Sequence, residues 1–332
     1  MGGITKRKPY AVLFAGIIFL SLGITTYPLQ SESNSDTIIV DDDGTADYET
    51  IEQALQAAQN GDIIFVQSGL YEEQNLIVDK TLTITGENAA TTVVQGDGTT
   101  TLFFIQANRV SISNFTVTRG GGDLIGSNLE VSADDCIISD NIITDGEDVG
   151  IAVYDTSNTV IKNNEISHCP FAGIRSNANS YGNTIKNNQI TECINGILVE
   201  DTTEELIQYN IISHCSKAIY LEECSNNIVK RNHLHNNEQG VFVTYADDNL
   251  ITENNFVSNR EHAKFTTWLS PTGLQISTWD KNYYDDTLGI LPKWIPGILF
   301  IRTFNPIGIF IPWGSLDWHP AQIPYDIVGG SR

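Results

Sequence analysis

The chain has 332 residues, of which 41% are hydrophobic, and it carries 41 Asp and Glu against 18 Lys and Arg, a formal net charge of −23. This length suits two ordinary domains or one solenoid, and the apolar fraction is sufficient for a continuous core. So acidic a surface repels phosphate backbones, which argues against a nucleic-acid partner and leaves divalent cations, a neutral glycan or solvent alone.

Residues 1–36 are predicted to be a signal peptide or an N-terminal membrane anchor plus a linker. Three basic residues, 6–8, precede an almost wholly apolar run over residues 11–24, which is the layout of a signal peptide. No A-x-A cleavage site follows, and the run extended to Leu29 has 19 residues, barely enough to span a bilayer. The sequence leaves open whether this segment is cleaved as a signal peptide or retained as a membrane anchor. Either one predicts an extracytoplasmic protein, secreted or anchored at the cell surface by this segment alone.

Residues 37–100 are predicted to form an N-terminal cap and the first coils of the fold. Thr50 followed by Gln53 matches a capping box, and Gly61 is expected to end the helix that starts there. The apolar stripe of this short helix consists of Ile51, Ala54, Leu55 and Ala58. The helix is expected to cover the open edge of the first coil, because the ends of a solenoid must be capped.

Residues 101–260 contain a sequence repeat. Four segments of 22 residues, beginning near residues 149, 195, 217 and 239, align with a small residue, two alternating apolar positions, a polar turn and an Asn. Alternation with a period of two predicts short, half-buried strands, and no segment has the pattern of a helix of useful length. The repeat therefore predicts an all-β fold, a right-handed parallel β-helix with strands that stack in register.

Two sets of residues recur once per coil and should stack along the solenoid. The asparagines are expected to form an internal ladder of amide hydrogen bonds. This ladder comprises Asn141, Asn164, Asn188, Asn210, Asn232 and Asn254, spaced by 22 to 24 residues. The small residues are Gly150, Gly173, Gly196, Ala218 and Gly240.

Residues 261–332 abandon the repeat and are predicted to form an irregular, aromatic-rich C-terminal cap. All five Trp lie here, so an aromatic binding surface is the functional alternative. Residues 289–313 are very apolar, but four prolines, Lys293 and Arg302 interrupt them, which makes a membrane-spanning helix a poor interpretation.

The chain resembles known families at several of these motifs. The segment DYETIEQALQAAQNGDIIFVQSGLYEE at residues 47–73 resembles the opening of pectate-lyase-like β-helix proteins. The coils resemble the repeats of NosD-like and archaeal surface proteins, and NYYDD at residues 282–286 is similar to an element that closes such repeats. The resemblance covers residues 37–327 and implies the β-helix fold. These superfamilies include enzymes, binding modules and, in the NosD-like group, proteins associated with copper-site maturation.

The outward residues of the first strand in each coil suggest a ligand-binding face. Aligning the coils places aromatic, carboxylate and guanidinium groups on one side, which is the chemistry of a glycan site or of a carboxylate Ca²⁺ site. The predicted ligand-binding residues are Tyr154, Arg175, Glu200, Asp201, Tyr220, Glu222, Glu223 and Phe242. We favour an exported protein that presents an elongated acidic face and binds carbohydrate, a polysaccharide or surface glycan, without catalysis.

The same face allows an enzymatic alternative. Glu200 and Glu222 are expected on adjacent coils, about 5–7 Å apart, a separation that straddles the retaining and inverting ranges of glycosidases. A lyase would need a base, and Arg175 is the only one on these stripes. The alternative is therefore a polysaccharide lyase or a glycoside hydrolase that uses these three residues.

The cysteines and histidines suggest a metal hypothesis. The five Cys include no CxxC motif and make a poor disulfide framework. His168 with Cys169 and His214 with Cys215 recur at one coil position, and thiolate with imidazole suits Cu(I) or Zn²⁺. We favour a column of inert, buried thiols, because Cys also packs well as a small core residue. A copper-accessory role is the alternative, and Ca²⁺ is a second open cofactor.

Overall fold

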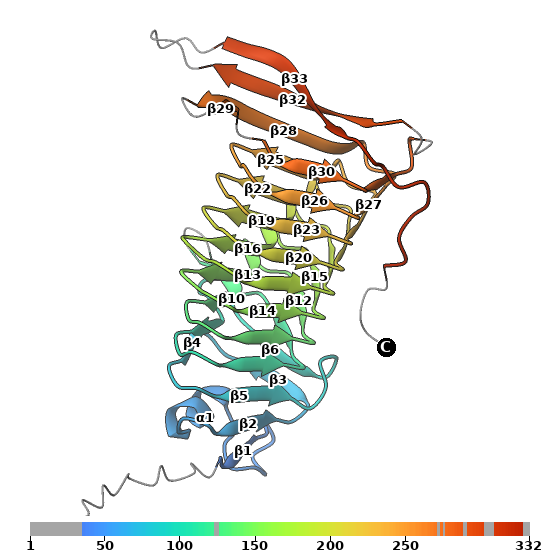
Figure 1. The fold of residues 1–332 in the computed structure, drawn as a ribbon. Helices are drawn as coiled ribbons and strands as arrows, with labels where there is room; N and C mark the ends of the chain where they lie inside the picture. Colours follow the sequence, from blue (N-terminus) through green and yellow to red (C-terminus); the bar gives the residue numbers. More distant parts are fainter. Residues whose placement is uncertain are drawn as a thin grey trace, which may run out of the picture. The chain divides into compact units, whose positions relative to one another are not determined.

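Figure 1 shows the computed structural model of the protein, which describes residues 35–122, 126–270, 273–274, 276–287, 291–301 and 309–327. The predicted signal or anchor segment, apart from its last two residues, lies outside this description. The described residues belong to one compact unit. Within the described ranges, no helix has the length and apolarity to cross a membrane.

The described residues form three sheets in which the coils stack in parallel, and from β2 onward each coil adds one strand to each sheet (Figure 1). The 11-stranded sheet contains β1 (Thr37–Val40), β2 (Ile63–Val66), β5 (Thr83–Gly86), β8 (Ser111–Ser113), β11 (Ile137–Ser139), β14 (Val160–Lys162), β17 (Thr184–Lys186), β20 (Leu206–Gln208), β23 (Ile228–Lys230), β26 (Leu250–Thr252) and β30 (Thr278–Asp280). The 10-stranded sheet contains β3 (Gly69–Glu72), β6 (Thr92–Gln95), β9 (Thr116–Thr118), β12 (Ile142–Thr144), β15 (Glu165–Ser167), β18 (Gln189–Thr191), β21 (Ile211–Ser213), β24 (His233–His235), β27 (Asn255–Val257) and β31 (Tyr283–Tyr284).

The third sheet, with 12 strands in the described part of the chain, carries the outward face predicted to bind a ligand. It contains β4 (Leu76–Val78), β7 (Phe103–Ile105), β10 (Ser127–Val131), β13 (Val149–Tyr154), β16 (Ala172–Asn177), β19 (Asn195–Glu200), β22 (Lys217–Glu222), β25 (Gln239–Thr244), β28 (Glu261–Ser270), β29 (Gly273–Leu274), β32 (Lys293–Ile301) and β33 (Ile309–Asp317). All neighbours pair in parallel except β29 with β28 and β33 with β32. The predicted parallel solenoid is confirmed.

The predicted asparagine ladder is also confirmed inside the solenoid. Each side-chain amide donates to the side-chain oxygen of the next rung at 2.9 to 3.1 Å. Each of these oxygens also accepts the backbone N–H of the rung before it. The ladder runs one rung further than predicted, to Asn282, and the buried carboxylate of Asp317 ends it by accepting from the Asn282 amide at 3.0 Å. Buried polar groups are thereby satisfied in every rung.

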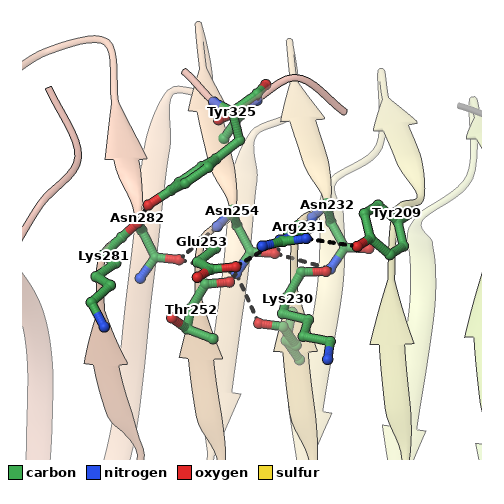
Figure 2. Close-up of polar contacts among 12 residues, drawn as sticks. Tyr209, Lys230, Arg231, Asn232, Thr252, Glu253, Asn254, Lys281, Asn282 and Tyr325 are labelled. Atoms are coloured by element: carbon green, nitrogen blue, oxygen red, sulfur yellow. Dashed lines mark hydrogen bonds and ion pairs between the residues drawn. The ribbon is translucent and has the colours of Figure 1, made fainter. Parts of the chain in front are cut away.

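From β8 onward, each turn from the 11-stranded to the 10-stranded sheet passes through one residue in the left-handed region. From Asp140 to Lys281 these residues have φ between 53° and 61°, and none of them is glycine. Figure 2 shows one group of them: the guanidinium of Arg231 binds the Glu253 carboxylate at 2.7 Å and donates to the Tyr209 hydroxyl at 2.9 Å. Contacts between stacked turns offset part of the strain that a side chain suffers in this conformation.

The N-terminal helix α1 (Ile51–Ala57) forms where the sequence predicts it. The Thr50 side chain accepts the N–H of Gln53 at 3.2 Å, and the Glu73 carboxylate accepts the N–H groups of Ile51 and Glu52 at 2.7 and 2.8 Å. The expectation that Gly61 ends the helix is wrong. The helix ends at Ala57, and Gly61, with φ of +98°, turns the chain toward β2.

The C-terminal region differs from the irregular cap we predicted. The solenoid continues past residue 260 for one more coil, formed by β28, β30 and β31. The strands β32 and β33 then form an antiparallel ribbon whose first strand pairs with β28 (Figure 1). After β33 the chain reaches Tyr325, which exchanges two 2.8 Å hydrogen bonds with the Asn255 side chain and donates its hydroxyl proton to the Lys281 carbonyl (Figure 2).

Candidate functional site

Three columns of aligned residues run along the 12-stranded sheet from β16 to β28, in the predicted register. The first column contains Ala172, Asn195, Lys217, Gln239 and Glu261. The second contains Arg175, Leu198, Tyr220, Phe242 and Lys264. The third contains Glu200, Glu222, Thr244 and Thr266. Parallel in-register pairing thus gathers on one face residues that lie far apart in the sequence.

Arg175 does not present its guanidinium to solvent as we predicted, since the residue is only 8% exposed. Its Nε binds the Glu200 carboxylate at 2.7 Å, and a terminal nitrogen donates to the Tyr154 hydroxyl at 3.3 Å. The rings of Tyr154 and Phe171 lie 5.7 and 5.5 Å from the guanidinium carbon. The outward side chains therefore pack on one another, and Arg175 organises this face instead of serving as a free base.

Ala152 and Leu198, which align with Arg175 at outward positions of β13 and β19, are also buried. They are each 1% exposed and belong to a small apolar cluster outside the main core. Phe171, Tyr154 and Tyr220 cover this cluster. The sheet therefore has hydrophobic packing on both of its faces over this stretch.

Tyr220 and Phe242 form the aromatic pair that the sequence predicts. Their ring centroids are 5.2 Å apart and their planes are inclined by 18°. Each ring covers one face of the other, so a ligand meets ring edges together with the Lys217 ammonium, which lies 4.6 Å from the Tyr220 centroid. Burial raises the pKa of the Tyr220 hydroxyl, and the Glu222 carboxylate contributes in the same direction. The hydroxyl therefore stays protonated.

The carboxylates of this face have unequal surroundings. Glu200 is held by Arg175 and accepts a 3.3 Å hydrogen bond from the Asn177 amide. Glu222, its neighbour in register, is part-exposed like Glu200. Asp201 and Glu223 are exposed residues of the turn after the strand, each with φ of 48°. A glycosidase pair would need one of these carboxyl groups to reach the substrate as an acid, and the Glu200 carboxylate is instead engaged by the Arg175 guanidinium at 2.7 Å.

A hollow of about 540 Å³ adjoins the aromatic pair. We call it the Gln239 hollow, and it is lined by Ser216, Glu238, Gln239, Arg260, Glu261 and Lys264. Gln239 donates to the Glu261 carboxylate at 2.8 Å, and the Lys264 ammonium lies 3.3 Å from the same carboxylate. Since Lys264 follows Phe242 in register, the hollow continues the face that carries the aromatic pair. Sequence reasoning missed it, because Arg260 and Glu261 were assigned to the boundary of the C-terminal cap.

The structure separates the residues of the metal hypothesis. Cys169 and Cys215 are buried with Cys193 in one column of the core, while the His168 side chain is 54% exposed and pairs with Glu192. The contact with the Cys193 thiol and burial raise the pKa of Cys169, so this thiol stays protonated. Thiol and imidazole of successive residues point to opposite sides of the coil wall, and the pattern does not fit a copper or zinc site.

His214 lies beside two histidines that the sequence analysis overlooked. Its ring centroid is 6.4 Å from that of His235, which is 4.8 Å from that of His233. Burial lowers the pKa of His233 and of His235, which favours their neutral forms. The part of the chain that the structure describes contains no group of three or more His, Cys, Asp or Glu side chains arranged to hold a metal ion. The Ca²⁺ hypothesis therefore rests on composition alone.

Comparison with solved structures identifies the fold again. The chain is similar to XylC in complex with xylose, with a TM-score of 0.61 and 14% identity over 74% of this chain and 68% of that one. It is similar to the GH136 lacto-N-biosidase of Eubacterium ramulus, with a TM-score of 0.57 and 12% identity over 74% and 60% of the two chains. A third structure is the mannuronan C-5 epimerase AlgE4 A-module of Azotobacter vinelandii, with a TM-score of 0.53 and 13% identity over 70% and 81%.

These identities are low enough that the likeness shows the fold alone. No curated protein matches the sequence significantly. The family model described as "Right handed beta helix region" matches three overlapping stretches, residues 31–181, 84–206 and 131–286. Together these stretches cover all the coils from β1 to β31. The chain therefore belongs to the right-handed β-helix family.

Proposed function

We propose that this protein binds carbohydrate along the outward face of the 12-stranded sheet, outside the cytoplasm, and does not cleave it. The observation that carries the proposal is the set of columns around Tyr220 and Phe242, where an aromatic pair lies between cationic and amide groups on one side and carboxylates on the other. Sugars are bound by such combinations of ring contact and planar polar groups. The solved structures named above include proteins that bind or act on sugars, which supports the same ligand class.

Binding without cleavage is favoured by the state of Arg175 and Glu200. A catalytic base or acid must reach the substrate with its proton-transferring atom free. Both side chains are part of one ion pair, with side-chain exposures of 10% and 20%. They are better suited to holding Tyr154 and Asn177 in place than to exchanging protons.

The test is a glycan array with the purified protein, followed by titration calorimetry on the hits. Tyr220→Ala should weaken binding about tenfold, the scale of losing an aromatic anchor. Ile194→Ala is the matched control, since Ile194 is exposed on the neighbouring coil and lines neither the aromatic pair nor the Gln239 hollow. Equal affinities of the parent and Tyr220→Ala would disprove binding at this face.

Cleavage is measured on the same hits. Reducing ends would reveal a hydrolase, and ultraviolet absorbance of unsaturated uronates would reveal a lyase. We expect neither product. Product that disappears in Glu222→Gln while binding persists would make the protein a polysaccharide-active enzyme instead.

A further inference from the structure

A second hollow, of about 410 Å³, lies where the C-terminal ribbon meets the last coil. We call it the Trp294 hollow. Its walls come from residues 259–263, which include Arg260 and the start of β28, from Asp285 and Asp286 after β31, and from the start of β32. No part of the site described above includes Trp294, Asp285 or Asp286. The hollow has one aromatic wall and several polar walls.

Trp294 supplies the aromatic wall. The residue is 56% exposed, although its ring is large and apolar. A Cβ atom on Gly314, in the paired strand β33, would overlap the indole ring. The absence of a side chain at Gly314 therefore lets the indole lie against the backbone of β33. The rest of the indole surface faces the hollow. A supported, rigid and exposed indole is suited to contact with the apolar side of a sugar ring.

Asp285 and Asp286 supply fixed acceptors opposite this ring. The Asp285 carboxylate accepts the Ser258 N–H at 2.7 Å and lies 3.0 Å from Nε2 of His262. The Asp286 carboxylate binds the Lys293 ammonium at 2.6 Å. Both carboxylates stay part-exposed, so they keep lone pairs for the hydroxyl groups of a ligand.

His262 positions these carboxylates and has no free ring nitrogen for proton transfer. Its side chain is 7% exposed and packs against the stacked rings of Phe256 and Tyr284. Its second nitrogen lies 3.5 Å from the Asn259 amide. Burial lowers the pKa of His262 despite the two aspartates, which favours a neutral ring that donates to Asp285. The polar groups of the hollow are therefore arranged to bind a ligand and not to transfer a proton to it.

The two hollows form one path along the sheet, because Arg260 and Glu261 line both of them. Lys264 in the Gln239 hollow follows Phe242 in register, and β28 pairs directly with β32, which carries Trp294. The strands β22, β25, β28 and β32 are successive neighbours. Three steps of about 4.8 Å then place Trp294 roughly 14 Å from Tyr220 along the stack. That span suits a ligand of several linked rings.

We propose that the Trp294 hollow is an end subsite that takes a further sugar ring of a neutral oligosaccharide lying across β22, β25, β28 and β32. The inference rests on the proposed carbohydrate binding and specifies its ligand. Neutral sugars are favoured because Glu261, Asp285 and Asp286 outnumber Arg260 and Lys293 in the walls. The net charge of −23 on the whole chain further opposes a polyuronate.

Calorimetry with a length series tests the inference. The probes are cello-, xylo- and manno-oligosaccharides from the disaccharide upward, with oligogalacturonates as the acidic arm, all on the full chain. For the parent, affinity should rise with length until the ligand reaches Trp294. Trp294→Ala should then lose about tenfold for the long oligomers and nothing for the short ones, since a buried aromatic anchor contributes on this scale. Tyr220→Ala should weaken all lengths.

Two further variants make the result specific. Gly314→Ala should reproduce the Trp294→Ala pattern, because the added methyl group displaces the indole while the polar wall is unchanged. Trp318→Ala removes a Trp that is 64% exposed and does not line the hollow, and it should match the parent.

The outcomes separate the inference from the proposed function. If Trp294→Ala binds long oligomers as the parent does while Tyr220→Ala fails, the end subsite is disproved and carbohydrate binding stands. If the parent binds no oligosaccharide of any length, the proposed function and the subsite both fail. Tighter binding of oligogalacturonates that is lost in Trp294→Ala would overturn the neutral specificity.

Discussion

At the scale of single residues, one carboxyl group stands out among the amides inside the solenoid. Glu205 occupies a second internal column, between Asn183 and Asn227, and is 1% exposed. One of its oxygens accepts from Ser176 and Asn183, but the other oxygen and the Asn227 amide nitrogen have no partner among the described residues. Burial raises the pKa of Glu205 to about 7. The native state therefore keeps a proton on this group well above the pH at which the unfolded chain releases it.

This proton makes stability depend on pH. Between the unfolded pKa of about 4.3 and the folded value of about 7, the native state binds more protons than the unfolded state, so the free energy of unfolding falls as pH rises. The loss is complete above the folded pKa and is on the order of 3 kcal/mol. We expect Glu205→Gln to match the parent near pH 4 and to exceed its stability at pH 8, as measured by urea unfolding.

A neighbouring carboxylate provides the control for this measurement. Glu204 precedes Glu205 and is exposed, so Glu204→Gln should leave the pH profile as it is in the parent. A parent whose stability rises between pH 5 and pH 8, or a Glu205→Gln variant with an unchanged profile, would show that Glu205 ionises normally inside the solenoid.

At the scale of elements, period-two alternation predicts which strand residues face the core but not which outward residues become buried. Ile197 and Val199 lie in the core as predicted. Leu198 points away from it and is still buried, because Phe171, from the turn before β16, and Tyr220 help to cover that face. The residues that pack on Leu198 come from a turn and from the next coil. The alternation of residues within β19 therefore cannot predict that Leu198 is buried.

Leu198→Ala tests this outer packing. A residue on a solvated stripe would cost less than about 0.5 kcal/mol when shortened, whereas a buried Leu costs about 2–5 kcal/mol. We expect a loss of at least about 2 kcal/mol in urea unfolding. Ile194→Ala, at an exposed position of the same coil, should stay near the parent. Equal small losses in both variants would mean that the outer cluster contributes nothing to stability.

The C-terminal ribbon shows a second limit of sequence patterns. Pro296 and Pro312 interrupt the apolar run of residues 289–313, which we used only to argue against a membrane-spanning helix, and proline also removes a donor from a β-ladder. Pro312 nevertheless lies within β33, the last strand of the 12-stranded sheet in the described residues, where a missing N–H needs no partner. The repeat therefore predicted the coils and the asparagine ladder, which recur, while the ribbon and the Trp294 hollow arise from contacts that occur once.

At the scale of the whole molecule, the excess of acidic over basic residues affects the stability of the solenoid. Parallel stacking brings residues of like charge together at equivalent positions, as it does for Asp201 and Glu223 in the turns after β19 and β22. Mutual repulsion of this kind destabilises a compact state and is weakened by salt. The dependence of stability on salt therefore reports whether the acidic surface is only screened or also binds cations specifically.

Thermal unfolding in NaCl and in CaCl₂ at matched ionic strength distinguishes screening from binding. We expect both salts to raise Tm by the same amount, because no described group of carboxylates is arranged to hold a metal ion. A site that bound Ca²⁺ only in the native state would add RT ln(1 + [Ca²⁺]/Kd), about 2.7 kcal/mol at a hundredfold excess over Kd. An additional rise in Tm with CaCl₂, reversed by a chelator and absent with MgCl₂, would establish a specific Ca²⁺ site. Glu200→Gln, Glu222→Gln and Glu223→Gln would then locate that site on the 12-stranded sheet or exclude it from there.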